Sequence, residues 1–292
     1  IMNKIIQLNI DFAVIDEEYT FRNGLKLPIF KISSYHTLVQ FIGYAKYLNR
    51  STGNVYLRGQ HKMYDTLIPA IFRNCSSRNG GVCNRNTRIS EIVRECTNRM
   101  DLIRDLDELV REPILQHYGI GTRWIDLVDN LWIAIWFGIH DWHTRILERE
   151  YRNVIPRQGG PNEYMYLLLI CSDGINEDKN VPGLYKGDCT YTVDLRKAAP
   201  STFLRPHAQH ALLMRSKHLQ TTEHLDLADR IVGIAKLKVD DCISWIGTNG
   251  LTSARNLFPP VNFDNGYGVL IEKAPHRKNF IKEYGSIYSI TY

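Results

Sequence analysis

Residues 116–126 read QHYGIGTRWID, and residues 131–137 shortly after them read LWIAIWF. The second run is apolar on every side, and Asp129 and Asn130 before it are residue types that cap helix N-termini well. We therefore expect a buried helix over 131–137, although an apolar run of this length also suits a buried strand. The first run gathers polar and aromatic side chains just before that helix, and this makes it a candidate functional segment.

Regular spacing of apolar residues predicts two further helices. One follows the N-cap candidates Ser33 and Ser34 and places its apolar residues between positions 38 and 48. The other is amphipathic and extends from Thr87 to Leu109. The polar segment 74–86 between them is expected to be an exposed loop.

Short runs rich in β-branched and aromatic residues predict strands at 55–59, 166–171, 191–195 and 231–239. The run at 166–171 is apolar throughout, which is typical of a central strand that is buried on both faces. The segment 152–163 is expected to be a linker or an exposed turn. Helices and short strands follow one another without a regular βαβ order, and this favours an α+β fold over a doubly wound sheet.

The composition is that of an ordinary globular protein. The chain has 292 residues, 44% of them hydrophobic and 23% charged, which excludes a disordered or fibrous protein and allows a sizeable core. Lys and Arg number 36 against 31 Asp and Glu, so the formal net charge is +5. A balance this mildly basic permits a nucleic-acid partner, and plain solubility explains it equally well.

Cysteine spacing and hydropathy bear on the compartment. The six cysteines include no C-x-x-C pair, so we expect reduced thiols and no metal site. The apolar runs stay below the ~18 residues of a membrane span, and the start of the chain lacks a secretory pattern. We therefore expect a cytoplasmic protein without a membrane partner.

Common nucleotide and hydrolase motifs are missing from the sequence. It contains neither type of glycine-rich phosphate loop, nor G-x-S-x-G, nor H-E-x-x-H. If a nucleotide binds, side chains and isolated main-chain amides must hold it.

Three segments depart from ordinary core chemistry: YLRGQ at 56–60 with LIPAIFR at 67–73, the stretch 116–126, and RPHAQHALL at 205–213. Together they resemble the FRG domain family, which is named for an aromatic-Arg-Gly triplet. Its members carry a Q-H-Y/H-G-x-x-T-R-x-x-D block before an apolar helix, and later a stretch similar to R-x-x-x-Q-x-G-x-F. The runs VDLR at 193–196 and LFP at 257–259 resemble later landmarks of that family.

The similarity extends from residue 33 to residue 260. It implies an FRG domain over 33–260, an N-terminal extension over 1–32, and a C-terminal segment over 261–292 that packs on the same domain. Leu57 precedes the Arg where the family often has Phe or Tyr, and Ala211 and Leu213 stand where Gly and Phe are usual.

The resemblance implies a fold and a chemistry similar to those of ADP-ribosyltransferases. The fold would be a single α+β domain with a central mixed or antiparallel sheet and flanking helices. Such enzymes cleave the nicotinamide bond of NAD and transfer ADP-ribose to a protein or a nucleic acid. FRG proteins are also associated with bacterial toxins and anti-phage defence. The implied protein is thus a mono-ADP-ribosyltransferase toxin that uses NAD without a metal. The basic net charge favours a nucleic-acid acceptor, RNA more than DNA, and a toxin is expected to have a neutralising antitoxin as its partner.

Arg58 and Gly59 end an apolar strand. A guanidinium at this position can bind a pyrophosphate or a ribose with paired hydrogen bonds, and Gly59 would let a ligand approach the main chain. The alternative for Arg58 is an ion pair that ties the strand to a helix, for example with Asp126.

The stretch 116–126 would hold the nicotinamide riboside. The resemblance implies that Arg58, His117 and Gln209 are the catalytic residues. It assigns Arg58, Gly59, Gln116, Tyr118, Thr122, Arg123 and Asp126 to the NAD site, where an aromatic face (Tyr118 or Trp124) would stack on the cationic ring. The alternative is a hydrogen-bonded turn that caps the helix.

Gln209, which we expect on a strand, stands where such transferases keep a carboxylate that binds the ribose 2′-hydroxyl. A Gln side chain keeps the acceptor oxygen but lacks the charge that would favour an oxocarbenium-like transition state. The alternative is a buried Gln that bonds to the main chain. The base that deprotonates the acceptor must then be another residue: His117, Asp126, Asp194 or His210. Asp126 has two alternative roles. It could orient Arg58, Arg123 or His117, or it could cap the following helix.

Two groups of basic residues would suit a nucleic-acid backbone: Arg73, Arg78, Arg85 and Arg88 in one, and Arg205, His207, Arg215 and Lys217 in the other. Scattered Arg on a solvated surface is the plainer reading. Two rival functions stay open, a non-catalytic nucleic-acid-binding or sensor module and an RNase-like toxin that uses His117 and His210.

Overall fold

The computed structural model describes residues 5–73, 75, 81–146, 150–219, 225–247, 250–274 and 284–291. Within these residues, strands form a large mixed sheet with the spatial order β1 (Val14–Thr20), β2 (Lys26–Lys31), β11 (Ile231–Lys238), β7 (Tyr164–Cys171), β3 (Val55–Gln60), β4 (Ile125–Val128), β10 (Ala211–Ser216), β9 (Thr190–Asp194) and β8 (Leu184–Lys186). Strand β11 pairs with β2 in parallel, and the other neighbours pair antiparallel. A smaller sheet has the order β12 (Ser289–Thr291), β6 (Glu150–Pro156) and β5 (His140–Ile146).

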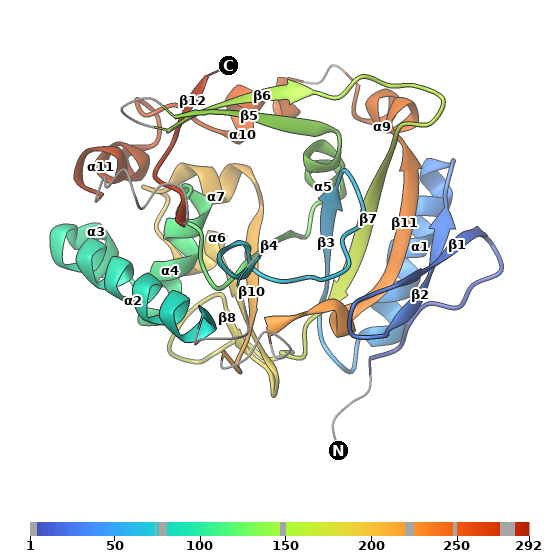
Figure 1. Ribbon diagram of the computed structural model, residues 1–292, viewed down its shortest axis with the longest axis horizontal. Helices are drawn as coiled ribbons and strands as arrows, with labels where there is room; N and C mark the ends of the chain where they lie inside the picture. Colours follow the sequence, from blue (N-terminus) through green and yellow to red (C-terminus); the bar gives the residue numbers. More distant parts are fainter. Residues whose placement is uncertain are drawn as a thin grey trace.

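Helices flank the large sheet, as Figure 1 shows. They are α1 (Tyr35–Asn49), α2 (Gly81–Arg99), α3 (Asp101–Arg104), α4 (Glu108–His117), α5 (Leu131–Gly138), α6 (Leu195–Ala198), α7 (Leu204–Ala208), α9 (Val239–Ile246), α10 (Ala254–Leu257) and α11 (Asn265–Lys273), with short 3-10 turns at Ala70–Phe72, Ala228–Arg230 and Gly250–Thr252. In Figure 1, α1 lies beside β11 at one end of the molecule, α2 and α3 lie at the other end, and the small sheet crosses the top. The predicted α+β class is confirmed.

The central strand β7 explains how the core is divided. Leu167 and Leu169 pack with α1 and α5 on one face of the sheet, whereas Leu168 and Ile170 pack with Tyr56 on the opposite face. Because both faces are buried, the strand has no polar alternation. The prediction of a central strand at 166–171 is confirmed, as are the strands at 55–59, 191–195 and 231–239 within a residue or two at their ends.

The predicted buried helix is α5. Asn130 is its N-cap, and the side-chain oxygen of Asn130 accepts hydrogen bonds from the main-chain N–H groups of Trp132 and Ile133. The helix after Ser34 is α1, although the Ser34 side chain makes no capping hydrogen bond.

The prediction of one helix from Thr87 to Leu109 is wrong. The segment forms α2, α3 and the start of α4, because Met100 adopts an extended conformation and Asp107 caps a new helix by accepting from the Leu109 N–H. Helix α2 already begins at Gly81, so the end of the predicted loop 74–86 is helical, and residues 74 and 76–80 lie outside the described residues.

Two other segments also differ from expectation. Residues 150–156 form β6 and not a turn, since they pair with β5 on one side and β12 on the other. The segment 1–32, which the sequence analysis treats as an extension, supplies β1 at one edge of the large sheet and β2 beside it. In the described part of the chain, no helix combines the length and the apolar character needed to cross a membrane.

Candidate functional site

A cleft opens in the middle of the large sheet, where β3 and β4 diverge. Strand β3 pairs with β7 along its whole length, from Val55 to Gln60, but with β4 only through Leu57 and Val128. An antiparallel ladder would continue beyond that pair. Here the strands separate instead, and both line a cleft of about 780 Å³.

Arg58 bridges this gap. Its Nη1 donates to the main-chain oxygen of Asp126 at 2.7 Å, and its Nε is buried with no hydrogen-bond partner in the described residues. Burial lowers the pKa of the Arg58 guanidinium, and the nearby Asp126 carboxylate opposes that shift. The contact with Asp126 thus runs through the main chain, and the guanidinium keeps donors for an anionic ligand.

His117 is the last residue of α4 and lines the same cleft. Its main-chain oxygen accepts from Nη1 of Arg205 at 3.3 Å, and its Nε2 is buried without a partner among the described residues. Burial, and then the positive charge of Arg205, lowers the pKa of the His117 imidazole to about 3. The ring is therefore neutral near pH 7, and its buried Nε2 is left to exchange a hydrogen bond with a ligand.

Tyr118, Thr122 and Arg123 are not among the residues that line the cleft. The Tyr118 hydroxyl donates to Asp264 at 2.6 Å, and the Thr122 hydroxyl donates to Gln116. Arg123 donates from Nε, Nη2 and its main-chain N–H to the carboxylate of Glu112, which is 5% exposed. Trp124 is only 1% exposed and is also absent from the lining.

The stretch 116–126 therefore divides into two sets. Gln116, His117, Gly119, Ile120, Gly121 and Asp126 line the cleft. The side chains of Tyr118, Thr122 and Arg123 form the second set, and their hydrogen bonds hold the first set in position. The alternative of a hydrogen-bonded turn that caps the helix is thus confirmed for the hydrogen bonds but wrong for the cap, because Asn130 caps α5.

Gln209 also lines the cleft, which brings it into one site with Arg58 and His117. Its Nε2 donates to the Leu257 oxygen at 2.6 Å, and its side-chain oxygen accepts no hydrogen bond within the described part of the chain. The expectation of a strand position is wrong, because Gln209 follows the last turn of α7 and β10 begins only at Ala211.

Gly59 also lines the cleft, but the need for a glycine at this position comes from packing and not from the approach of a ligand. A Cβ at this position would lie 1.8 Å from the main-chain oxygen of Ala134 on α5. The glycine is required by the approach of helix α5 to strand β3, and so its presence says nothing about a ligand.

Sequence reasoning missed much of the cleft lining. Aromatic rings form one part of it: Tyr64, Phe137, Trp142, Phe258, Tyr284 and Tyr288. Charged and imidazole groups form another: Arg152, Asp141, His61, His140 and His143. The run HDWH at 140–143, directly after the apolar helix, was the available signal, since it concentrates polar and aromatic groups next to the stretch already selected.

His140 has a defined hydrogen-bonding state. Its Nδ1 lies 2.7 Å from the Trp136 oxygen, and a carbonyl oxygen can only accept, so Nδ1 carries the hydrogen. The ring stacks on Trp136 with centroids 3.9 Å apart, and burial lowers the pKa of the imidazole. Nε2 is therefore an unprotonated acceptor at neutral pH.

Two base candidates lie elsewhere. Asp194 and His210 both bond to Arg196, at 2.7 and 2.9 Å, and neither lines the cleft. Arg196 also pairs with Asp129 at 2.7 Å. These groups tie α6 to the end of β4.

The two basic groups from the sequence do not form two continuous surfaces. Arg205 is fully buried, with its guanidinium 4.5 Å from the rings of Tyr118 and Tyr267. Arg73 lines the cleft, Arg85 and Arg88 belong to α2, and Arg78 lies outside the described residues.

The fold and the site define an α+β protein whose mixed sheet opens into a cleft of small-molecule size. Residues 53–145 match the FRG domain, which covers β3, the stretch 116–126 and α5. This match supports the resemblance to the FRG family. The comparisons with curated proteins and with solved structures found no match.

Proposed function

We propose that this protein is a mono-ADP-ribosyltransferase that takes ADP-ribose from NAD. One observation carries the proposal: Arg58, His117 and Gln209 come from three distant segments and line one cleft together with several aromatic rings. The volume of about 780 Å³ lies in the range of clefts that bind drug-sized and cofactor-sized ligands, ~300–1,000 Å³. The sheet that opens between β3 and β4 supports an ADP-ribosyltransferase-like fold.

Guanidinium groups would bind the pyrophosphate of NAD. Arg58 offers donors at the cleft floor, and Arg73 and Arg152 also line the cleft. Arg forms paired hydrogen bonds with phosphate oxygens, which Lys cannot match. The other NAD-site residues that reach the cleft are Gly59, Gln116 and Asp126.

The nicotinamide ring would stack on the aromatic part of the cleft. Tyr118 and Trp124 do not line the cleft, and guanidinium groups already face the rings of Tyr284 and Tyr288, so we assign this role to Trp142. Before the bond breaks the nicotinamide ring is a cation, and the face of the indole attracts it. Gln209 would accept the ribose 2′-hydroxyl through its side-chain oxygen.

The reaction exchanges one bond at the ribose C1′ for another. The C1′–N bond breaks, its electron pair leaves with nicotinamide, and an acceptor oxygen or nitrogen forms a new bond to C1′ and loses a proton. Asp126 and Asp141 are the carboxylates in the cleft lining that would favour positive charge at C1′. His140 joins His117 as a base candidate, since its Nε2 is free to take the proton.

The biological role proposed from the resemblance is that of a toxin or an anti-phage effector, with RNA as the first acceptor to test and an antitoxin as its partner. A second candidate function is nucleic-acid binding without covalent chemistry. The cations and rings of the same cleft favour it, because aromatic stacking with phosphate contacts is the usual way to hold single strands.

The test uses NAD labelled in the adenylate part, incubated with the protein and with RNA, DNA or bulk protein separately. We expect label on one acceptor and released nicotinamide, and both should fall at least ~100-fold in Arg58→Ala. Arg22→Ala, an exposed guanidinium paired with Asp65, is the matched control and should behave as the parent. Salt-sensitive RNA binding without label transfer would favour the second function, and shortened RNA without NAD would indicate an RNase. No nicotinamide release with any acceptor would end the transferase proposal.

A further inference from the structure

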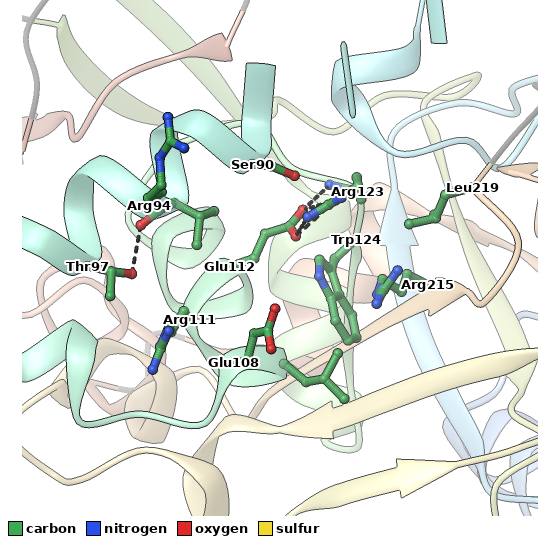
Figure 2. Close-up of a pocket in the computed structure, with 12 residues that line it drawn as sticks. Ser90, Arg94, Thr97, Glu108, Arg111, Glu112, Arg123, Trp124, Arg215 and Leu219 are labelled. Carbon is green, nitrogen blue, oxygen red and sulfur yellow. Dashed lines mark hydrogen bonds and ion pairs between the residues drawn. The ribbon is translucent and has the colours of Figure 1, made fainter. Parts of the chain in front are cut away.

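A second cavity of about 420 Å³ lies apart from the cleft, between α2, α4, β10 and the residues just before β4 (Figure 2). It shares no lining residue with the cleft. Its charged lining residues are Arg94, Arg111, Arg123, Arg215, Glu108 and Glu112. The cavity thus has a surplus of positive charge.

The charges of Arg123 and Glu112 cancel each other, because the two residues form an ion pair. Arg123 and Glu112 bond through several atoms, with 2.6 Å between Nη2 and Oε2 (Figure 2). Arg111 donates to the main-chain oxygens of Leu106 and Arg104, which carry no full charge. Arg94 and Glu108 have no hydrogen-bond or ion-pair partner among the described residues.

Arg215 is the residue that most requires a ligand. Its guanidinium lies 5.1 Å from the rings of both Trp124 and Tyr191, and its Nε is buried without a partner in the described part of the chain. Burial lowers the pKa of this group, and the nearby Glu112 carboxylate, which is itself paired with Arg123, opposes that shift. A guanidinium in such surroundings is normally matched by an anion that accepts its hydrogen bonds.

Trp124 provides a second, independent observation. It is 1% exposed, lines the cavity, and its indole Nε1 has no hydrogen-bond partner among the residues described. Buried indole N–H groups normally find an acceptor. Two buried donor atoms without a partner among the described residues, Arg215 Nε and Trp124 Nε1, therefore belong to residues that line the same cavity.

We propose that this cavity binds a small phosphate monoester that carries hydroxyl groups, such as a sugar phosphate or a nucleoside monophosphate. A phosphate monoester has a double charge and three acceptor oxygens, which suits Arg94, Arg215 and the Trp124 N–H better than the two oxygens of a carboxylate. The free carboxylate of Glu108 accepts hydroxyl hydrogens from the organic part. The cavity is about half the size of the cleft, which fits one mononucleotide and excludes a dinucleotide.

The test is calorimetric titration with AMP, ribose 5-phosphate, inorganic phosphate, adenosine and succinate. We expect the two monoesters to bind at least ~10-fold more tightly than phosphate, adenosine or succinate. If AMP binds more tightly than ribose 5-phosphate, the ligand is a nucleotide; if ribose 5-phosphate binds more tightly, the ligand is a sugar phosphate. Absence of binding at millimolar AMP and ribose 5-phosphate, or equal binding of succinate, would overturn the proposal.

Variants locate the site. Arg215→Gln should weaken monoester binding at least ~10-fold and Arg94→Ala severalfold, whereas Arg99→Ala on the same helix α2 should leave it unchanged. Arg94 is exposed, so Arg94→Ala still tests the site if Arg215→Gln fails to fold. Arg58→Ala should also bind normally, which separates this cavity from the cleft and from the transferase proposal. Equal binding by Arg94→Ala, Arg215→Gln and the parent would place the ligand elsewhere and overturn the assignment.

Discussion

Gly59 is the residue at which strand β3 comes closest to helix α5. The main-chain oxygen of Ala134 occupies the place where a Cβ would stand, and the main-chain nitrogen of Gly138 lies within 3.1 Å of the same point. Both neighbours are main-chain atoms of a buried helix, so neither can move aside alone. A methyl group at this position must displace the helix or bend the strand.

We predict that Gly59→Ala lowers the free energy of unfolding by about 3 kcal/mol or more. Gly43→Ala is the matched control, because Gly43 lies on the exposed side of α1 with nothing within 4 Å of its added Cβ. That change should raise stability by roughly 0.5–1 kcal/mol. Urea denaturation of both variants measures the effect, and equal stabilities would contradict the packing argument.

His117 makes stability depend on pH in a calculable direction. Burial holds its pKa at about 3 in the folded protein, against 6.5 ordinarily, so below pH 6.5 the unfolded chain binds a proton that the folded chain refuses. The stabilisation is complete above pH 6.5 and decreases as the pH falls towards 3. For this one group, the loss from about pH 8 to about pH 5 is roughly 2 kcal/mol.

The measurement is urea denaturation of the parent and of His117→Gln at both pH values. The variant should lose less stability on acidification than the parent, by roughly 2 kcal/mol. His36→Gln removes an exposed imidazole on α1 and should retain the parent's acid sensitivity. An unchanged acid sensitivity in His117→Gln would show that His117 is accessible to protons in the folded state.

Sequence reasoning brought Arg58, His117 and Gln209 into one site, but it could not say which neighbours face that site. Residues 118–124 belong to no helix or strand, so no periodicity indicates which side chains point inward. Thr122 and Arg123 bond to Gln116 and Glu112, so their polar groups are not available to a ligand. These bonds depend on where α4 lies, because Gln116 and Glu112 belong to that helix.

At the scale of elements, Arg196 joins helix α6 to the residues that follow β4 and to those that precede β10. It lies on α6 and contacts Asp194 and Asp129, each at 2.7 Å, and His210 before β10 at 2.9 Å. Asp194 is 4% exposed and also caps α6. Hydrogen bonds and ion pairs with these carboxylates raise the pKa of the guanidinium, which stays charged.

We predict that Arg196→Met destabilises the protein by about 3–5 kcal/mol, because it leaves a buried carboxylate without its cation. Lys197→Ala removes the neighbouring, half-exposed pair with Glu177 and should cost less than about 1 kcal/mol. Denaturant titration compares the two variants. If Arg196→Met were as stable as Lys197→Ala, the network would not hold α6 against β4.

The helices and strands that could be predicted are those whose own sequence contains the cause of their conformation. Strand β7 is apolar because both of its faces are buried, one against helices α1 and α5 and the other in a second apolar cluster that contains Tyr56. Helix α5 has both an apolar run and Asn130 as its N-cap. Strand β1 reads VIDEEYT and is exposed at nearly every residue, so its sequence shows no apolar alternation. Such edge strands are held by their partners, and a single sequence does not contain that information.

At the scale of the whole molecule, the cleft depends on the C-terminal segment. Tyr284 and Tyr288 line it, and β12 pairs in parallel with β6, far away in the sequence. The segment also explains Gly119, which has a φ of +126° and whose Cβ would lie 2.2 Å from the Ser286 oxygen. Contacts between residues this distant leave no spacing pattern, and so the aromatic part of the cleft was not predictable.

Tyr288 is where these distant segments meet. It is 5% exposed, the Arg152 guanidinium lies 4.0 Å from its ring centroid, and its main-chain oxygen accepts from the Tyr267 hydroxyl at 2.6 Å. We predict that Tyr288→Ala costs about 3–5 kcal/mol, because its side chain leaves a cavity between the small sheet and the stretch 116–126. Tm should fall by roughly 10 °C. Tyr47→Ala, at a tyrosine that is 60% exposed, should cost less than about 1 kcal/mol. Calorimetry of both variants checks this, and equal Tm values would mean that the C-terminal segment adds nothing to the stability of the molecule.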